Sequence, residues 1–210
     1  MSIYFYKGSP IETPVTITSD RFYYESTSLS LKRQITSTEG QRWILDFNVK
    51  QNPHADEQSM FLEHVSEPFR VHSMVMPQLP SVDRKAVLSK ARTRSGNYSA
   101  GTDTIPITRG FPAGETNGTA NQVYPKGMFI RFANHPKVYV VTETIAWGSA
   151  NDTVMNIFPK LVHPVPVGTE IHLGNACEIT YILDSSVIKG LTFTDGIISS
   201  PGTVRIIENI

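Results

Sequence analysis

Apolar and polar residues alternate with a period of two in several parts of the chain, which is the pattern of half-buried β-strands. The clearest example is residues 43–50, where Trp43, Leu45, Phe47 and Val49 share one face and the residues between them share the other. A strand is also predicted over residues 23–31. The segment 38–41 (TEGQ) between them contains a glycine that suits a turn. We therefore interpret Leu29 to Val49 as a hairpin.

One helix is predicted, over residues 53–66. Asn52 is a good N-cap, and the proline after it suits the first helical position. Asp56 and Glu57 lie in the first turn, where the helix dipole favours acidic side chains. Alternation over residues 69–76 then predicts a further strand.

The middle of the chain has a different composition. Residues 96–127 hold six of the 14 glycines, together with several prolines, which predicts a long loop with short extended pieces such as residues 104–108. Loops of this length are uncommon unless they are functional or ordered by a partner. Short strands at a spacing of about 8–12 residues, typical of a sandwich or barrel, are predicted after it at 128–132, 137–145, 154–158, 169–173, 178–183, 191–198 and 204–208.

These patterns together predict a mainly β fold. We expect a single domain over residues 1–210, shaped as a β-barrel or sandwich, with one packed α-helix and a long loop insertion. Residues 1–80 would form N-terminal hairpins and the helix, residues 81–127 the loop-rich insertion, and residues 128–210 the C-terminal strands.

Composition indicates a protein that assembles with others. Hydrophobic residues make up 40% of the chain and charged residues only 18%, compared with about 25% charged residues in average proteins. Lys plus Arg and Asp plus Glu are both 19, so the formal net charge is zero. A chain of this kind lacks the electrostatic footprint of a nucleic-acid-binding protein, and its neutrality favours association.

The chain's ends and its cysteine content give a cellular context. Cys177 is the only cysteine, which excludes a disulfide within the chain. The N-terminus lacks the pattern of a signal peptide, and no apolar run reaches the roughly 20 residues of a membrane span. We expect a protein that is made and folds in a cytoplasm.

Motifs that would identify an enzyme, a metal site or a cofactor site are not found in the sequence. His172 and Cys177 could form a two-ligand metal site, but a buried thiol and an ordinary strand histidine are the preferred interpretation. Carboxylates in predicted turns leave open a glycan hydrolase, with candidates Asp103, Glu115, Asp152 and Asp195. Because aspartate is common in turns for conformational reasons, we expect no enzyme, metal or cofactor.

Two further groups of residues have open roles. The basic residues Arg84, Lys85, Lys90, Arg92 and Arg94 could touch DNA phosphates, although an interface loop is preferred. The aromatic cluster near the N-terminus belongs either to the core or to a subunit interface, where aromatic residues are enriched, and consists of Tyr4, Phe5, Tyr6, Phe22, Tyr23 and Tyr24.

Two stretches resemble a known family. The first is LSLKRQITSTEGQRW at residues 29–43, in which a basic strand leads through a turn to Gln-Arg-Trp and an alternating strand. The second runs through GMFIRF at 127–132, KVYVVT at 137–142, NIFPKL at 156–161 and PVGT at 166–169. In their order and spacing these segments resemble bacteriophage distal tail and tail-tip proteins, which form the ring at the baseplate hub.

The resemblance implies a tail-tube-type β-barrel that forms a ring, commonly a hexamer. Such a ring would be a structural part of the virion tail, assembled in the host cytoplasm. It would join the tail tube protein to the hub or tip proteins, and DNA would pass through its lumen without sequence-specific binding. We expect the subunit interfaces to include Leu29, Leu31, Arg33, Arg42, Trp43, Arg84, Lys85, Arg92 and Arg94.

Two other functions remain open. A carbohydrate-binding β-sandwich of a phage tail would recognise a host-surface glycan by stacking it on Trp147 or Tyr98. A tail-associated glycan hydrolase would use the Asp and Glu residues named above. A structural ring subunit is the preferred function.

Overall fold

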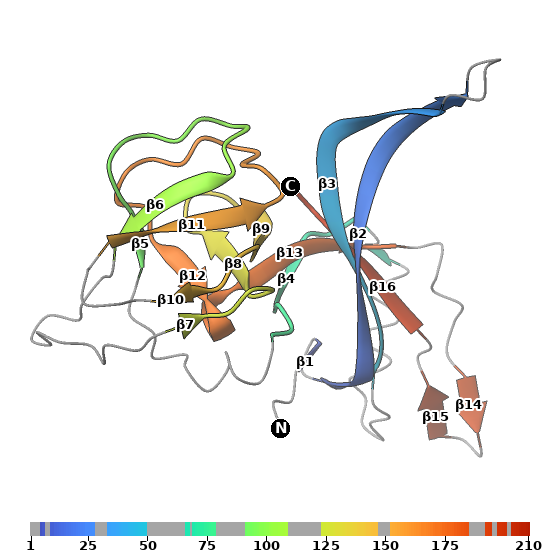
Figure 1. The fold of residues 1–210 in the computed structure, drawn as a ribbon. Helices are drawn as coiled ribbons and strands as arrows, with labels where there is room; N and C mark the ends of the chain where they lie inside the picture. The colour runs from blue at the N-terminus through green and yellow to red at the C-terminus, as the bar shows by residue number, and fades with distance from the viewer. Residues whose placement is uncertain are drawn as a thin grey trace, which may run out of the picture. The chain divides into compact units, whose positions relative to one another are not determined.

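The fold is mainly β, as the alternating pattern predicts (Figure 1). The computed structural model describes residues 5–6, 9–27, 33–49, 66–67, 69–78, 91–108, 123–146, 152–184, 192–194, 197–200 and 203–210. The first strands are β1 (Phe5–Tyr6), β2 (Ser9–Thr27), β3 (Arg33–Val49), β4 (His72–Val75), β5 (Arg92–Thr93), β6 (Thr104–Thr108), β7 (Val123–Tyr124) and β8 (Phe129–Phe132). The others are β9 (Val138–Val141), β10 (Ile145–Ala146), β11 (Asp152–Phe158), β12 (Ile171–Leu173), β13 (Glu178–Leu183), β14 (Thr192–Thr194), β15 (Ile197–Ser200) and β16 (Thr203–Glu208), with a 3₁₀ turn at Gly174–Ala176.

The chain divides into two compact units. The first consists of Met1–Tyr6, Val71–Thr180 and Ile210, and we call it the barrel unit. The second consists of Lys7–Arg70 and Tyr181–Asn209, and we call it the arm unit. The main segment of the barrel unit, Val71–Thr180, is therefore inserted into the sequence of the arm unit. The expected single domain over residues 1–210, with its three parts, stays a prediction.

A six-stranded sheet with the order β12-β8-β9-β11-β6-β5 forms the barrel unit. Its two edges meet, because Arg92 of β5 bridges Glu170 just before β12. Backbone hydrogen bonds from Ile171 N to Ala91 O (2.9 Å) and from Thr93 N to Thr169 O (3.0 Å) join the same edges. The sheet is thus nearly closed, and few of its backbone groups are left at an edge.

Inward-facing side chains fill this barrel. On β8 the buried residues Ile130 and Phe132 alternate with the half-buried Phe129 and Arg131, as period-two pairing requires. The interior is apolar and closely packed, and its buried residues are Ala91, Ile105, Ile107, Tyr124, Met128, Ile130, Phe132, Tyr139, Val141, Ile145, Met155, Ile157, Leu161, Val165 and Ile171.

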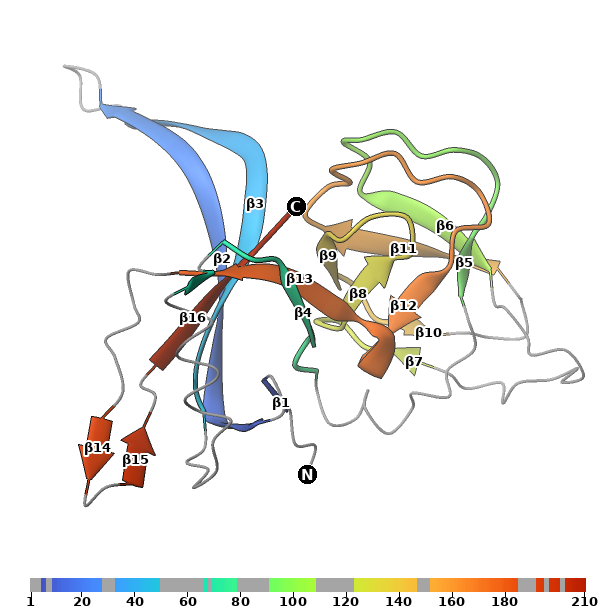
Figure 2. The ribbon, with the colours of Figure 1, turned by 180° about the vertical axis from the view of Figure 1, so that it is seen from behind.

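Four strands in the order β2-β3-β16-β13 form the sheet of the arm unit, seen from two sides in Figures 1 and 2. Their buried side chains are aligned in rows across the strands. Val204 of β16 lies opposite Phe47 of β3, and all of the alternating residues predicted to share a face of β3 are buried. Ile206 of β16 lies between Leu45 of β3 and Leu183 of β13. The alternation therefore predicted the buried face of β3 correctly.

The predicted turn at residues 38–41 is wrong, and so is the hairpin from Leu29 to Val49. Residues 33–49 form one continuous strand, β3, which pairs along its length with β2. Gly40 lies in an irregularity of this ladder, where the pairs Arg21↔Gln41 and Tyr23↔Ser37 are consecutive. Three residues of β3 therefore oppose a single residue of β2, as in a β-bulge, and the glycine marks that bulge.

Other predicted elements have mixed outcomes. The extended piece at 104–108 is confirmed as β6, one of the barrel strands. The strand predicted at 191–198 is two strands, β14 and β15, with Thr194 paired to Ile197. Asp-Gly, a favoured pair for a two-residue hairpin turn, separates them in the sequence. The predicted helix at 53–66 lies outside the described residues, apart from Ser66.

Within the described ranges, the chain has no helix of the length and apolar character needed to cross a membrane.

Candidate functional site: the β2–β3 arm

The most unusual feature of the arm unit is a β-ribbon that extends beyond its sheet. β16 pairs with β3 only from Asn48 back to Ile44, whereas β2 and β3 stay paired as far as Thr27↔Arg33. We call residues 23–27 of β2 and 33–37 of β3 the arm. In Figures 1 and 2 the arm rises from the sheet with no third described strand of its unit beside it.

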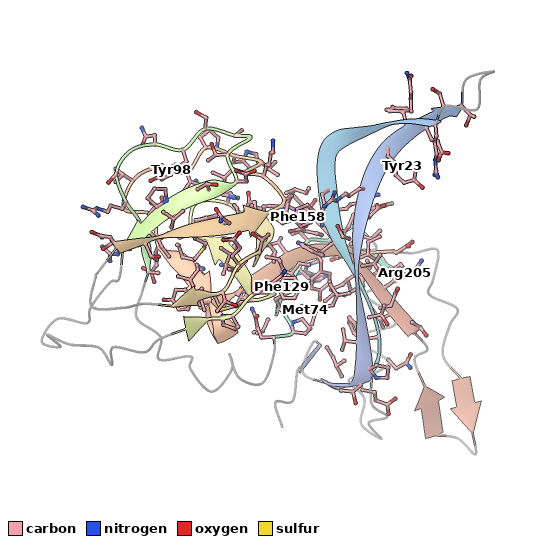
Figure 3. The ribbon with its side chains drawn as sticks, viewed as in Figure 1. Tyr23, Met74, Tyr98, Phe129, Phe158 and Arg205 are labelled. Carbon is pink, nitrogen blue, oxygen red and sulfur yellow. The ribbon has the colours of Figure 1, made fainter. Side chains whose placement is uncertain are left out.

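Each face of the arm carries an exposed tyrosine. Tyr23 is 62% exposed and Tyr24 is 73% exposed. Because neighbouring residues of a strand point to opposite faces, the two rings lie on opposite faces of the ribbon. Tyr23 pairs with Ser37, and Tyr24 pairs with Thr36. Figure 3 shows Tyr23 on the arm, with Arg205 on β16 in the sheet from which the arm rises.

An exposed ion pair lies near the tip of the arm. Arg33 contacts the Glu25 carboxylate with its Nε at 2.5 Å and its Nη2 at 2.8 Å. The Arg33 side chain is 61% exposed, so solvent screens the pair and it adds at most about 1 kcal/mol to stability. Glu25 and Arg33 are the only residues with side chains charged at neutral pH among residues 23–27 and 33–37, so these residues have no net charge.

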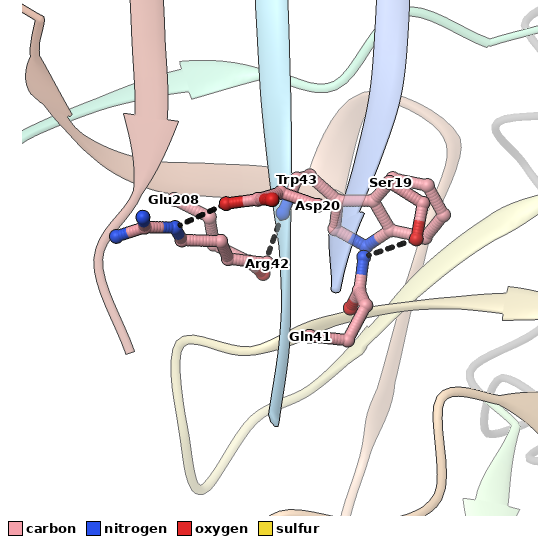
Figure 4. A network of polar contacts seen from close by, with 6 residues as sticks. All are labelled: Ser19, Asp20, Gln41, Arg42, Trp43 and Glu208. Atoms are coloured by element: carbon pink, nitrogen blue, oxygen red, sulfur yellow. Dashed lines mark hydrogen bonds and ion pairs between the residues drawn. The ribbon is translucent and has the colours of Figure 1, made fainter. Parts of the chain in front are cut away.

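Polar contacts lock the two strands at the base of the arm (Figure 4). The Arg42 guanidinium donates to Asp20 at 3.0 Å, across a directly opposed pair of residues. The Gln41 amide donates to the Ser19 hydroxyl at 3.1 Å, and Gln41 is only 4% exposed. These contacts fix the register of β2 and β3 where they leave the sheet.

Glu208 completes this base from the last position of β16. Its carboxylate accepts a 3.0 Å hydrogen bond from the backbone N–H of Trp43. Glu208 and Trp43 are both buried, and Tyr181 lies opposite Glu208 on β13. β16 pairs its backbone with β3 only as far as Ile44, so the carboxylate extends the hydrogen bonding by one residue.

The described residues that were predicted for the subunit interface come from both units. Arg33 lies on the arm, Arg42 lies at its base and Trp43 lies in the buried row behind it. Arg92 and Arg94 are exposed on or beside β5 of the barrel unit, and Arg94 forms an ion pair with Asp152. The remaining predicted residues lie outside the described part of the chain: Leu29, Leu31, Arg84 and Lys85.

A second polar cluster lies at one end of the barrel. His135 is 8% exposed, and its Nδ1 lies 3.0 Å from Asn134 Oδ1 while its Nε2 lies 2.8 Å from the Tyr139 hydroxyl. Because the Val162 N–H donates to the same hydroxyl at 3.2 Å, the hydroxyl proton is directed to Nε2. The Asn134 amide in turn donates to the Pro164 carbonyl at 2.9 Å.

The His135 ring is neutral in this cluster. Burial, followed by the charges of His163, Arg131 and Lys137, lowers the pKa of His135 from 6.5 to about 4. A neutral ring donates through Nδ1 and accepts through Nε2, which matches both of its partners. The cluster ties the turn after β8 to the loop around Val162, and its chemistry is that of a structural clamp.

His172 and Cys177, the candidate metal ligands, have other surroundings. The His172 Nδ1 lies 3.0 Å from Arg131 Nη2, and a guanidinium can only donate, so this nitrogen is an acceptor. Burial and the charge of Arg131 lower the pKa of His172. Cys177 is a buried thiol. Among the described residues, no cluster of three or more His, Cys, Asp or Glu side chains is placed to hold a metal ion.

Of the candidate carboxylates and stacking residues, the structure describes Asp103, Asp152 and Tyr98. Asp152 pairs with Thr108 at one end of the β6–β11 ladder, and Asp103 precedes Thr104 at the other end. Four residues of strand separate these ends, roughly 13 Å, which exceeds the separation of about 5–9.5 Å between glycosidase carboxylates. Tyr98 is half-buried, and its hydroxyl donates to the Arg94 carbonyl. Outside the described residues lie Glu115, Asp195 and Trp147.

Most of the base of the arm was not predicted from the sequence. Ser19, Asp20 and Glu208 were not among its candidates, because their partners lie 22 to 165 positions away in sequence. One signal was present: the buried face of β3 continues the alternation back to Gln41, and a buried amide requires a hydrogen-bond partner. Adjacent Tyr23 and Tyr24 were a second signal, since two neighbours in a strand cannot share one buried face.

No protein-family model and no curated protein matches this chain.

Proposed function

We propose that the protein is a structural, non-enzymatic subunit of a bacteriophage tail, and that copies of it form a ring where the tail tube meets the tip or baseplate. The observation that carries this proposal is the arm. Two paired strands extend out of the sheet and expose both faces, including Tyr23 and Tyr24. A feature of this kind suits contact with another subunit, because aromatic residues are enriched at interfaces.

The low charge of the chain agrees with this proposal. Its formal net charge is zero, and 18% of its residues are charged. Such surfaces associate more readily than highly charged ones. The barrel unit supplies a closed, well-packed body that needs no partner to cover its edges, so assembly contacts are left to the exposed arm.

The tail location rests on the sequence resemblance. The strand series of its second stretch is found as β8, β9 and β11 in the same order. The first stretch supports the resemblance less. The resemblance implies a strand, a turn and a second strand there, whereas residues 33–49 form one continuous strand. The proposal therefore draws its assembly role from the arm and its place in the virion from residues 127–169.

The partners of such a ring follow from its place. Copies of the chain would form the ring. The tail tube protein would contact one side of the ring, and the hub or tip proteins would contact the other. DNA would pass through the lumen without sequence-specific contacts. A head-to-tail contact repeated between copies closes into a ring when its rotation divides a full turn.

Two measurements test the proposal. Native mass spectrometry of the purified chain should give one oligomer whose mass is an integer multiple of 23.4 kDa, with the hexamer as the expected species. Immunogold labelling of intact phage particles with an antibody against the chain should then mark the distal end of the tail. A chain that stays monomeric at high concentration, or a label on the capsid alone, would contradict the proposal.

A further inference from the structure

The arm lacks the third neighbouring strand that the sheet of its unit has. At residues 44–48, β3 lies between β2 and β16 and has a strand on each side. At residues 33–37 it has only β2 among the described strands. The outer edges of the ribbon therefore carry backbone N–H and C=O groups outside the ladder, which is the usual template for pairing with another chain.

The arm also gains little stability from its own contacts. An isolated two-stranded hairpin is marginally stable at best in water, and three strands or a packed face are needed for independent stability. The described side chains of the arm are all exposed, from Tyr23 to Thr27 on β2 and at Arg33 and Gln34 on β3. Its ion pair at Glu25 is screened by solvent. A partner that covers the arm would supply the missing contacts.

Charge indicates what that partner is. The arm carries one acidic and one basic side chain, Glu25 and Arg33, which already neutralise each other. Lys32, which lies between the two strands in the sequence, adds one further base, and a net charge of one is too small to attract a strongly charged partner such as nucleic acid. The chain as a whole has a formal net charge of zero, so two copies approach each other without net repulsion.

We propose that the arm docks on a second copy of this chain, with Tyr23 and Tyr24 as the anchoring side chains of the contact. The tyrosines present large, rigid rings on both faces, so a neighbouring copy can enclose the ribbon between two surfaces. Backbone groups along the edges of the arm add hydrogen bonds to the neighbour. This inference rests on the proposed ring and names the part of the chain that holds it together.

The test compares two variants of the full-length chain. Tyr23→Thr/Tyr24→Thr removes both rings and keeps residues of high β-propensity. Phe69→Thr is the matched control, because Phe69 is a 79% exposed aromatic residue of the same unit outside the arm. Equal thermal melting of the dilute proteins establishes that both variants fold.

Sedimentation velocity over a range of concentrations gives the result. The arm variant should raise the concentration at which half of the copies are assembled by at least about tenfold, the effect expected for loss of anchoring residues. The Phe69→Thr variant should assemble like the wild type. If the arm variant assembles like the wild type, the inference is overturned and the proposed ring stands. If the wild type never assembles, the proposed ring itself fails.

Crosslinking identifies the occupant directly. p-Benzoylphenylalanine placed at position 24 is irradiated in a mixture of isotopically light and heavy copies of the chain. Peptides that join a light copy to a heavy copy would support docking between copies. Crosslinks that stay within one copy in the assembled protein, or that form only with another protein when cell extract is added, would overturn it.

Discussion

Glu208 lies where the sheet of the arm unit narrows from four strands to two. Its carboxylate accepts the Trp43 N–H at 3.0 Å in a buried setting. A buried backbone donor that loses its acceptor costs roughly 1–3 kcal/mol. The side chain therefore contributes to the stability of the sheet at the base of the arm.

Replacement of Glu208 tests this contribution. Glu208→Ala should lower the free energy of unfolding by roughly 1–3 kcal/mol, since it removes the acceptor. Glu208→Gln should lose much less, because its amide oxygen can still accept from the Trp43 N–H. Urea unfolding followed by circular dichroism measures both. Equal losses in the two variants would show that the charge of Glu208, rather than its acceptor oxygen, is what matters.

His135 gives the protein a dependence of stability on pH. The folded state keeps the ring neutral and has a pKa of about 4, whereas the unfolded chain has the ordinary value of 6.5. The unfolded chain thus binds the proton first as the pH falls. The free energy of unfolding should not depend on this group above pH 6.5 and should fall between pH 6.5 and about 4. Because each unit of pKa difference is worth 1.36 kcal/mol, the total loss is at most about 3 kcal/mol.

A variant isolates the effect of His135. His135→Gln has no titrating ring, so its melting temperature should decline less than that of the wild type between pH 6.5 and pH 4.5. The contribution of His172 is common to both proteins and cancels in the comparison. Parallel declines in wild type and variant would place the pH dependence in other groups.

At the residue scale, the sequence predicted buried apolar positions well and polar contacts poorly. Alternation identified the buried side chains from Trp43 to Val49 because burial depends on local period alone. The partners of His135 and Glu208 depend on which strands become neighbours. That choice is a property of the whole fold, so no local pattern carries it.

The middle of β3, residues 38–41, has a sequence that predicts a turn although it belongs to a strand. A glycine among polar residues at 38–41 is the usual signature of a turn, and this made the predicted hairpin persuasive. The long ladder to β2 overrides it, with the pairs on both sides of the irregularity still formed. Strand pairing over 13 opposed residue pairs outweighs the local preference of a short polar segment.

Gly40→Ala distinguishes a bulged strand from a turn. No heavy atom lies within 4 Å of a Cβ built at Gly40, and its φ is outside the left-handed region, so alanine should leave stability unchanged or raise it by up to ~1 kcal/mol. Gly168→Ala is the control, since Gly168 has equally open space but a φ of +77°. Calorimetry should show a loss of roughly 1–2 kcal/mol there. A similar loss at Gly40 would contradict the strand.

The insertion of one unit into the other is the main feature of the whole molecule. Residues 71–180 carry all of the barrel strands and the packed interior, and they are continuous in sequence. The arm unit takes residues from both sides of this segment. Composition and alternation predicted the fold class, but they do not reveal such an insertion, because both units are built from strands of the same kind.

A fragment of residues 71–180 should therefore fold without the rest of the chain. It contains both edges that close the sheet, including the bridge between Arg92 and Glu170. We expect a cooperative thermal transition and dispersed amide resonances in its NMR spectrum. A fragment of residues 7–70, which lacks β13 and β16, should show neither property. A disordered 71–180 fragment would show that the barrel depends on the arm unit.

The position of β16 has a consequence for the timing of synthesis. β16 lies between β3 and β13 in the sheet, yet it consists of residues 203–208. During translation β3 and then the whole barrel segment leave the ribosome before β16, so more than 150 residues are added between β3 and the strand that pairs with it. At about 5–20 residues per second, this addition takes roughly 10–30 seconds. During that time the β3 edge that β16 later covers is unpaired, so nascent chains on one messenger are exposed to premature pairing with one another until Glu208 has been translated.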